Sequence, residues 1–200
     1  GTAGLTVGLC IEEIDNHTPI NNLKVIVSGS TGGVGSIAVK LLSLLGAKVT
    51  AITGKKNSEQ YLCDLGSSKV INRKKFIDSI RSPLSNGVYS AAVDTVGGNV
   101  LSSMLTSMQY NGIITACGNV AGANFTTSVF PFILRKNRLI GIDSARCSIS
   151  IREKIWNKFS TIWRLKSLDH ICKVINLGSL DKEIKKILCG EQVGRIIVRL

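Results

Sequence analysis

The sequence predicts an α/β fold with a doubly wound, mostly parallel Rossmann sheet. The β-branched run Val25–Val27 is followed at once by a glycine-rich turn and then by a helical pattern. This order is typical of a strand and helix that hold the phosphates of a dinucleotide. Beyond it, strand and helix patterns alternate to about residue 142, as expected of a parallel sheet covered by helices. The 200 residues, 44% of them hydrophobic, suffice to bury such a sheet on both faces.

The elements up to residue 142 follow from periodicity and turn residues. The chain opens in a helical pattern, and after the glycine turn Val34, Ala38, Leu41 and Leu45 recur at helical spacing until Gly46 ends the helix. Apolar, β-branched runs bounded by turn residues predict the strands. After the strand Val25–Val27, strands are expected at residues 48–53, 69–72, 90–94, 112–117 and 139–142. Helices are expected at residues 33–45, 58–65, 99–108 and 130–135.

The last 55 residues, 146–200, have a different pattern. Ser148 to Leu165 predicts one long amphipathic helix, with Ile151, Ile155, Phe159 and Ile162 in register. A short strand, a helix over residues 180–189 and a final strand over residues 193–198 follow. The pattern offers the final strand no obvious partner domain within the chain.

The glycine turn is the strongest candidate for a binding site. It comprises Ser30, Thr31, Gly32, Gly33, Val34 and Gly35. A helix that begins here presents unpaired amides and the positive end of its dipole to a pyrophosphate. The fingerprint G-x-G-x-x-G is only partly met, because Ser30 stands where the first glycine would be. A glycine turn without a ligand is the alternative, which the strand–helix–strand context disfavours.

Cations follow the second and third strands. A carboxylate about 20 residues after the glycines binds the ribose hydroxyls of NAD, whereas a cation suits the 2′-phosphate of NADP. This sequence has Thr53, Gly54, Lys55 and Lys56 there, and Arg73 after the next strand would emerge at the same sheet edge. The pattern therefore favours NADP(H) over NAD(H). The alternative for each lysine is that it is only a solvent-exposed residue of a turn, without a phosphate contact.

Composition excludes several classes. The net charge is +12, and residues 151–200 carry eleven basic and five acidic side chains. These cations are scattered without interleaved aromatic residues, so we expect a field that attracts phosphorylated small molecules, and no nucleic acid as partner. The six cysteines include no C-x-x-C pair, which disfavours zinc, and we expect reduced, mostly buried thiols. Without a secretory signal or a transmembrane run, no membrane association and a cytoplasmic location are expected.

Five segments together resemble the medium-chain dehydrogenase/reductases, specifically the zinc-independent branch of quinone oxidoreductases and acrylyl-CoA reductases. They are Gly1–Thr6, Gly29–Gly35, Asp94–Gly98, Phe130–Arg135 with Leu139–Ser144, and Gly194–Arg195. The resemblance implies a linker helix at 1–20, a dinucleotide-binding domain at 21–145, and a C-terminal helix and strands at 146–200. It further implies that the last strand returns to a catalytic domain absent from this chain.

The resemblance also implies roles for individual residues. Thr31 to Val34 would contact the pyrophosphate, and Thr53, Gly54, Lys55 and Arg73 would surround the 2′-phosphate. Asn119, Ile133 and Ser144 would lie toward the nicotinamide half of NADPH. Lys55 stands where we expect arginine in close relatives, and it would bind phosphate as a point charge rather than through a bidentate fork.

The function implied is the NADPH-binding part of a reductase that transfers hydride to an activated alkene, such as acryloyl-CoA, or to a quinone-like enone. The proton donor is not assigned, and a homodimer is one expectation. A nucleotide-binding module without turnover is the alternative from another class. A short-chain dehydrogenase would need a lysine four residues after a tyrosine, and the three tyrosines lack one; a P-loop would need a lysine after Gly35.

Overall fold

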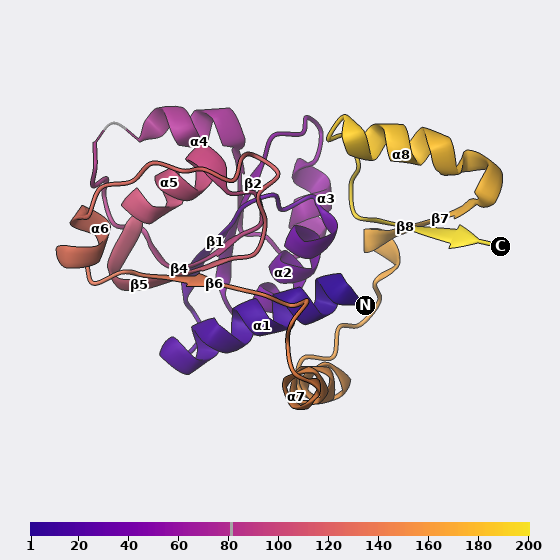
Figure 1. The fold of residues 1–200 in the computed structure, drawn as a ribbon, viewed down its shortest axis with the longest axis horizontal. Coiled ribbons are helices and arrows are strands. Elements are labelled where there is room, and N and C mark those ends of the chain that lie inside the picture. The colour runs from indigo at the N-terminus through magenta and orange to yellow at the C-terminus, as the bar shows by residue number, and fades with distance from the viewer. Residues whose placement is uncertain (81) are drawn as a thin grey trace.

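The computed structural model describes residues 1–80 and 82–200, and its centre is a six-stranded sheet (Figure 1). The strand order is β3-β2-β1-β4-β5-β6, and all neighbouring strands are parallel. The strands are β1 (Lys24–Val27), β2 (Lys48–Thr53), β3 (Lys69–Asn72), β4 (Tyr89–Asp94), β5 (Met108–Ala116) and β6 (Arg138–Gly141). This order confirms the doubly wound α/β fold that the sequence predicts.

Helices lie on both faces of the six-stranded sheet. They are α1 (Thr2–His17), α2 (Gly33–Leu44), α3 (Glu59–Asp64), α4 (Arg73–Ser79), α5 (Gly98–Thr106) and α6 (Phe130–Ile133). Alternate strand residues face two cores: Val25 and Val27 pack in the core with α1 and α2, whereas Ile26 packs in the core with α5. Burial on both faces explains why β1 is apolar at every position after the exposed Lys24.

Helix α7 (Ile149–Ser160) packs across α1 because two glycines allow close approach. A Cβ atom at Gly8 would lie 2.3 Å from Cγ2 of Ile155, and one at Gly4 would lie 3.2 Å from the ring of Trp156. On the same side of α1, the carboxylate of Glu12 pairs with the ammonium groups of Lys154 and Lys158. Burial raises the pKa of Glu12, but the hydrogen bonds from the two lysines outweigh it, so the pKa is lowered.

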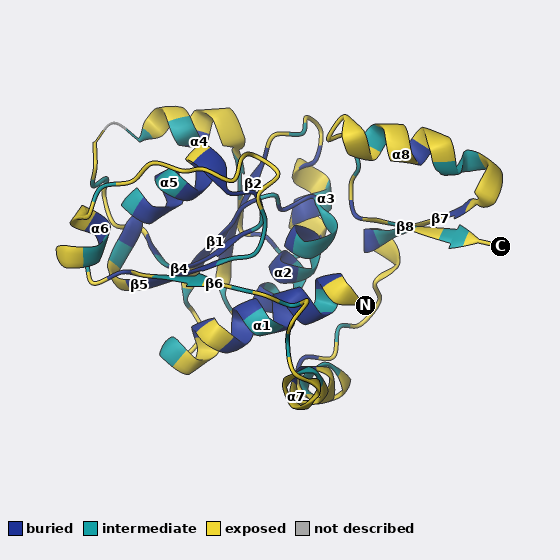
Figure 2. Cartoon of the chain, in the orientation of Figure 1, coloured by how far each residue is buried: buried dark blue, intermediate teal, exposed yellow. Residues whose placement is uncertain are grey.

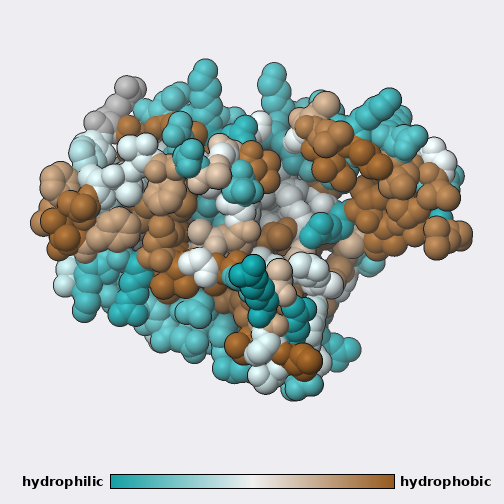
Figure 3. Space-filling model, viewed as in Figure 1, coloured by the Kyte–Doolittle hydropathy of each residue, from teal (hydrophilic) through white to brown (hydrophobic). Residues whose placement is uncertain are grey.

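The two C-terminal strands form a second, smaller sheet beside the first (Figure 1). Strands β7 (Cys172–Asn176) and β8 (Arg195–Arg199) pair in parallel, and α8 (Leu180–Leu188) connects them. Figures 2 and 3 show this unit as largely exposed and apolar. Its exposed apolar side chains include those of Ile184, Ile187 and Leu188 on α8.

Several sequence expectations are wrong in detail. The helix expected over residues 148–165 ends at Ser160, so Ile162 leaves the predicted face and is 69% exposed, whereas Trp163 is buried. Helix α4 was not predicted, and β5 begins at Met108 rather than at residue 112. Within the chain, the last strand pairs with β7, and its expected return to a catalytic domain stays a prediction. Of the six cysteines, all of them free, only Cys10 is buried, so "mostly buried" is also wrong.

Candidate functional site

The glycine turn brings the first turn of α2 close against the end of β1. Gly29 has φ +56°, and the N–H of Gly32 donates to its carbonyl oxygen at 2.9 Å. A Cβ atom at Gly35 would lie 2.3 Å from the same oxygen, so the packing requires glycine there. Helix α2 has no side-chain cap and no acidic residue in its first turn. Its N-terminal amides and dipole are therefore suited to an external anion.

Two cations lie beside this turn, Lys55 after β2 and Arg73 after β3. Lys55 Nζ donates to Thr31 Oγ1 at 3.1 Å, and the backbone N–H of Lys55 donates to Thr53 Oγ1 at 3.1 Å. The guanidinium of Arg73 lies over Gly54, where a Cβ atom would be 2.9 Å from its Nη2. Burial, and then repulsion from Arg73, lower the pKa of Lys55. A phosphate dianion between the two cations would offset both effects.

A buried carboxylate braces the neighbouring loop. Ser28 Oγ donates to Asp94 Oδ1 at 2.6 Å, and the N–H of Gly97 donates to Asp94 Oδ2 at 2.8 Å. Burial raises the pKa of Asp94, while these hydrogen bonds oppose the rise. The serine also accepts the N–H of Thr95 at 2.9 Å, so Ser28 and Asp94 together hold the loops after β1 and β4 in register. Asp94 thus serves the fold rather than facing a ligand.

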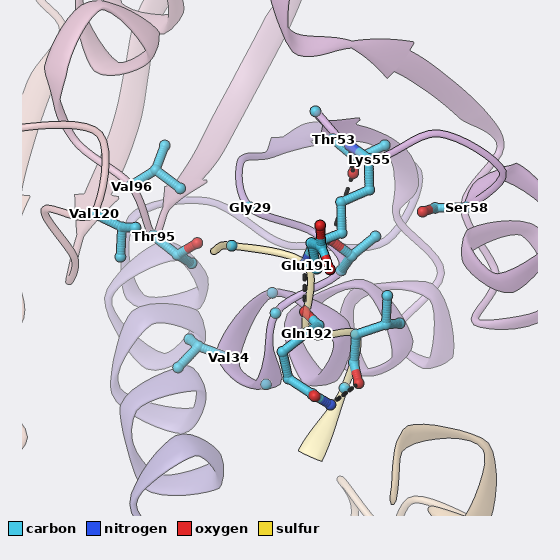
Figure 4. Close-up of a pocket in the computed structure, with 18 of the residues that line it drawn as sticks. Gly29, Val34, Thr53, Lys55, Ser58, Thr95, Val96, Val120, Glu191 and Gln192 are labelled. Atoms are coloured by element: carbon cyan, nitrogen blue, oxygen red, sulfur yellow. Dashed lines mark hydrogen bonds between the residues drawn. The ribbon is translucent and has the colours of Figure 1, made fainter. Parts of the chain in front are cut away.

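These segments surround a pocket of about 990 Å³ (Figure 4). Its floor is the glycine turn, and the end of β2 with its cations forms one side. Thr95, Val96, Val100 and Val120 form an opposite side that is mainly apolar, which suits the flat face of a nucleobase. A volume of this size is in the range of cofactor pockets.

The C-terminal segment forms a further wall. The N–H of Gly194 donates to the carbonyl oxygen of Thr31 at 2.8 Å, and Gly194 pairs with Gly32 in an isolated parallel bridge. Lys55 Nζ also donates to the carbonyl oxygen of Gln192, as Figure 4 shows. Sequence reasoning did not assign this segment to the site. The signal in the sequence was the pair of glycines at 190 and 194. Glycine readily adopts the positive φ that the structure shows at both positions.

The pocket brings together most, but not all, of the predicted residues. Those that line it are Thr31, Gly32, Gly33, Val34, Gly35, Thr53, Gly54, Lys55 and Arg73, and also Lys56. Four predicted residues do not line it. Ser30 is buried and donates to the carbonyl of Val27, and Ser144 accepts a hydrogen bond from Thr6 at 2.8 Å. Asn119 and Ile133 are exposed outside the pocket, so the structure gathers the adenosine and phosphate half of the prediction and leaves the nicotinamide half apart.

The structure describes residues 1–80 and 82–200. Within these ranges, no three or more His, Cys, Asp or Glu side chains cluster so as to hold a metal ion. In the same ranges, no helix combines the length and apolar character needed to cross a bilayer.

Comparison with known proteins gives consistent results. Residues 33–164 match the family model described as "Zinc-binding dehydrogenase". YhfP of Bacillus subtilis, classed by name among the quinone oxidoreductases, is 37% identical over 202 residues, which cover 100% of this chain and 61% of YhfP. Acrylyl-CoA reductase AcuI of Ruegeria pomeroyi is 33% identical over 99% of this chain and 60% of its own.

Solved structures of such relatives share the fold. The yhdH oxidoreductase of Salmonella enterica, solved in complex with NADP, superposes with a TM-score of 0.91 at 35% identity, over 100% of this chain and 61% of that one. YhfP, solved with NAD bound, has a TM-score of 0.92 at 37% identity, over the same shares. The chain thus spans about 61% of these relatives' length. It belongs to the medium-chain dehydrogenase/reductase family, in the branch that includes quinone oxidoreductases and acrylyl-CoA reductases.

Proposed function

We propose that the chain is the NADPH-binding part of a reductase that delivers hydride to an activated alkene, either an enoyl thioester such as acryloyl-CoA or a quinone-like enone. The observation that carries the proposal is the convergence, in one pocket, of the uncapped α2 N-terminus and the cations Lys55 and Arg73. An oxidoreductase relative solved with NADP bound supports the choice of cofactor.

The residues of this chain would bind and orient the cofactor. The α2 amides would accept the pyrophosphate, and Lys55 with Arg73 would hold the 2′-phosphate. The apolar side chains of Val96 and Val100 would cover the adenine. When bound, NADPH supplies the hydride that goes to the β-carbon of the alkene. We further propose that Asn119, Ile133 and Ser144 approach the nicotinamide half once the catalytic domain is present.

The domain division 1–20, 21–145 and 146–200 belongs to this proposal. In it, β7 and β8 continue into the catalytic domain that the resemblance implies, and that domain completes the substrate pocket. A cytoplasmic setting and a homodimer are further parts of the proposal. The six free thiols agree with a reducing compartment.

The test combines binding and turnover. Titration calorimetry should show that the chain binds NADPH more tightly than NADH. Oxidation of NADPH with acryloyl-CoA should then be slow for this chain and faster by orders of magnitude for a chimera that carries the N-terminal domain of AcuI, because that domain orients the substrate and excludes water. Absence of NADPH binding would refute the proposal.

Turnover separates the proposal from its alternative. A nucleotide-binding module without catalysis would bind NADPH and stay inactive in the chimera, whereas the proposed reductase would regain activity. Simple quinones, assayed beside acryloyl-CoA, distinguish the two substrate classes. Membership of the medium-chain family decides against the short-chain alternative.

A further inference from the structure

A carboxylate lines the pocket beside the glycine turn. Within residues 1–80 and 82–200, Glu191 is the only acidic residue that lines it. Glu191 lies on the segment between α8 and β8, and Figure 4 draws it with Lys55 among the residues around the pocket. The basic residues that line the pocket are Lys55, Lys56, Arg73 and Arg195. A site that is otherwise suited to anions therefore contains a negative charge of its own.

Backbone contacts place Glu191 toward the Lys55 side of the pocket. The N–H of Glu191 donates to the carbonyl oxygen of Lys186 on α8 at 2.8 Å. The next residue, Gln192, accepts a hydrogen bond from Lys55 Nζ through its carbonyl oxygen. The contact of this segment with the glycine turn comes three residues after Glu191, at Gly194. Glu191 is therefore nearer along the chain to the contact with Lys55, where we propose the 2′-phosphate, than to the contact with the glycine turn.

The charge of Glu191 is not neutralised by a neighbouring cation. Among the described residues, each ion pair includes Glu12 or Glu183, and none includes Glu191. Burial, and then repulsion from Arg73, lower the pKa of Lys55, whereas a carboxylate paired with that lysine would raise it. The carboxylate of Glu191 is therefore left to act on an anion that enters the pocket.

We propose that Glu191 is a specificity-determining residue, whose negative charge repels the 2′-phosphate and so limits the preference for NADPH over NADH. The inference rests on the proposed function. A phosphate monoester carries a charge of about −1.5 to −2 at pH 7. The ribose hydroxyl that takes its place in NADH is neutral, so the repulsion acts mainly on NADPH. It opposes part of the attraction that Lys55 and Arg73 exert on the same phosphate.

Glu191→Gln tests the proposal because it removes the charge and nearly keeps the size of the side chain. Glu13→Gln is the matched control. Glu13 is also exposed but lies on α1, outside the pocket, and its substitution changes the net charge by the same amount. Titration calorimetry would measure the affinities for NADPH and NADH at ionic strengths of about 0.01 and 0.15 M, between which the Debye length falls from about 30 to about 8 Å.

We expect Glu191→Gln to bind NADPH about two- to fivefold more tightly at the lower ionic strength, with a smaller gain at the higher one. Its affinity for NADH should stay the same, and Glu13→Gln should change neither affinity. Damage to the fold would weaken binding rather than strengthen it. Unchanged or weaker NADPH binding by Glu191→Gln, or an equal gain for NADH, would overturn the inference and leave the proposed function intact. Failure of the unmodified chain to bind NADPH would instead refute the proposed function.

Discussion

Removing the cations beside the glycine turn should convert the protein from one that prefers NADPH to one that barely distinguishes NADPH from NADH. The perturbations are Lys55→Ala, Arg73→Ala and their combination. Lys55 has its ammonium bonded to Thr31 and to the carbonyl oxygen of Gln192, and the guanidinium of Arg73 lies over Gly54. Both groups face the same pocket, so one phosphate can meet both.

The magnitude follows from the environment of each cation. A hydrogen bond to a charged group contributes about 1.5–3 kcal/mol. Lys55 is only partly buried and must exchange its protein partners for the phosphate, and Arg73 is exposed, so the lower value applies to both. Each single variant should therefore lose about tenfold in NADPH affinity, at about 1.4 kcal/mol per tenfold change. The double variant should lose most of the preference, and NADH affinity should change little in all three.

The assay is calorimetric titration with both nucleotides, with Lys48→Ala as the control because that exposed lysine lies at the other end of β2, outside the pocket. A pH series adds a second readout. Because the pKa of Lys55 is lowered, the preference for NADPH should decline as the pH rises into the alkaline range, and Lys55→Arg should prevent that decline. Equal affinities of the unmodified protein for NADPH and NADH would refute the reasoning.

Three further predictions concern the turn and its supports. Gly32→Val should fold, since its Cβ meets only one backbone oxygen, at 3.3 Å, but its side chain should block the phosphate and abolish NADPH binding. Gly35→Ala should instead lose stability in urea, because its Cβ would lie 2.3 Å from a backbone oxygen, and equal stability of the two variants would contradict this expectation. Ser28→Ala should lower stability by about 1–3 kcal/mol by removing a hydrogen bond from buried Asp94, measurable as a lower melting temperature. The lowered pKa of Glu12 gives stability that is present above the unfolded-chain pKa, near 4.5, and is lost as the pH falls through the folded pKa; melting of Glu12→Gln should vary less with acid.

Much of the sheet could be predicted because its strands are buried on both faces. After their first lysine, β1 is an apolar run and β2 a buried run rich in β-branched residues, and the glycine turn marks the helix between them. The end of α7 could not be predicted, because Ile162 continues the apolar register while the backbone at Thr161 leaves the helical region, with ψ −100°. Trp163 instead turns inward and is buried. Such a change of direction depends on tertiary packing rather than on periodicity.

The candidate site also has a part that the sequence predicts and a part that it does not. Its phosphate-facing residues follow β1 and β2 directly, so their common location follows from parallel topology. The contribution of Gln192 and Gly194 depends on a contact with residues far away in the sequence, for which local patterns give no evidence. The residues expected near the nicotinamide lie on exposed segments outside the pocket, and their common task remains a proposal.

The bridge between Gly32 and Gly194 also bears on how the protein folds. These residues are about 160 positions apart, so closing the loop between them is among the costlier steps in chain entropy. The glycine turn can form with β1, α2 and β2 alone, but its C-terminal wall can join only after Gly194 has been synthesised. The pocket is therefore expected to be a late product of folding, and acquisition of full nucleotide affinity would report that the C-terminal strand has docked.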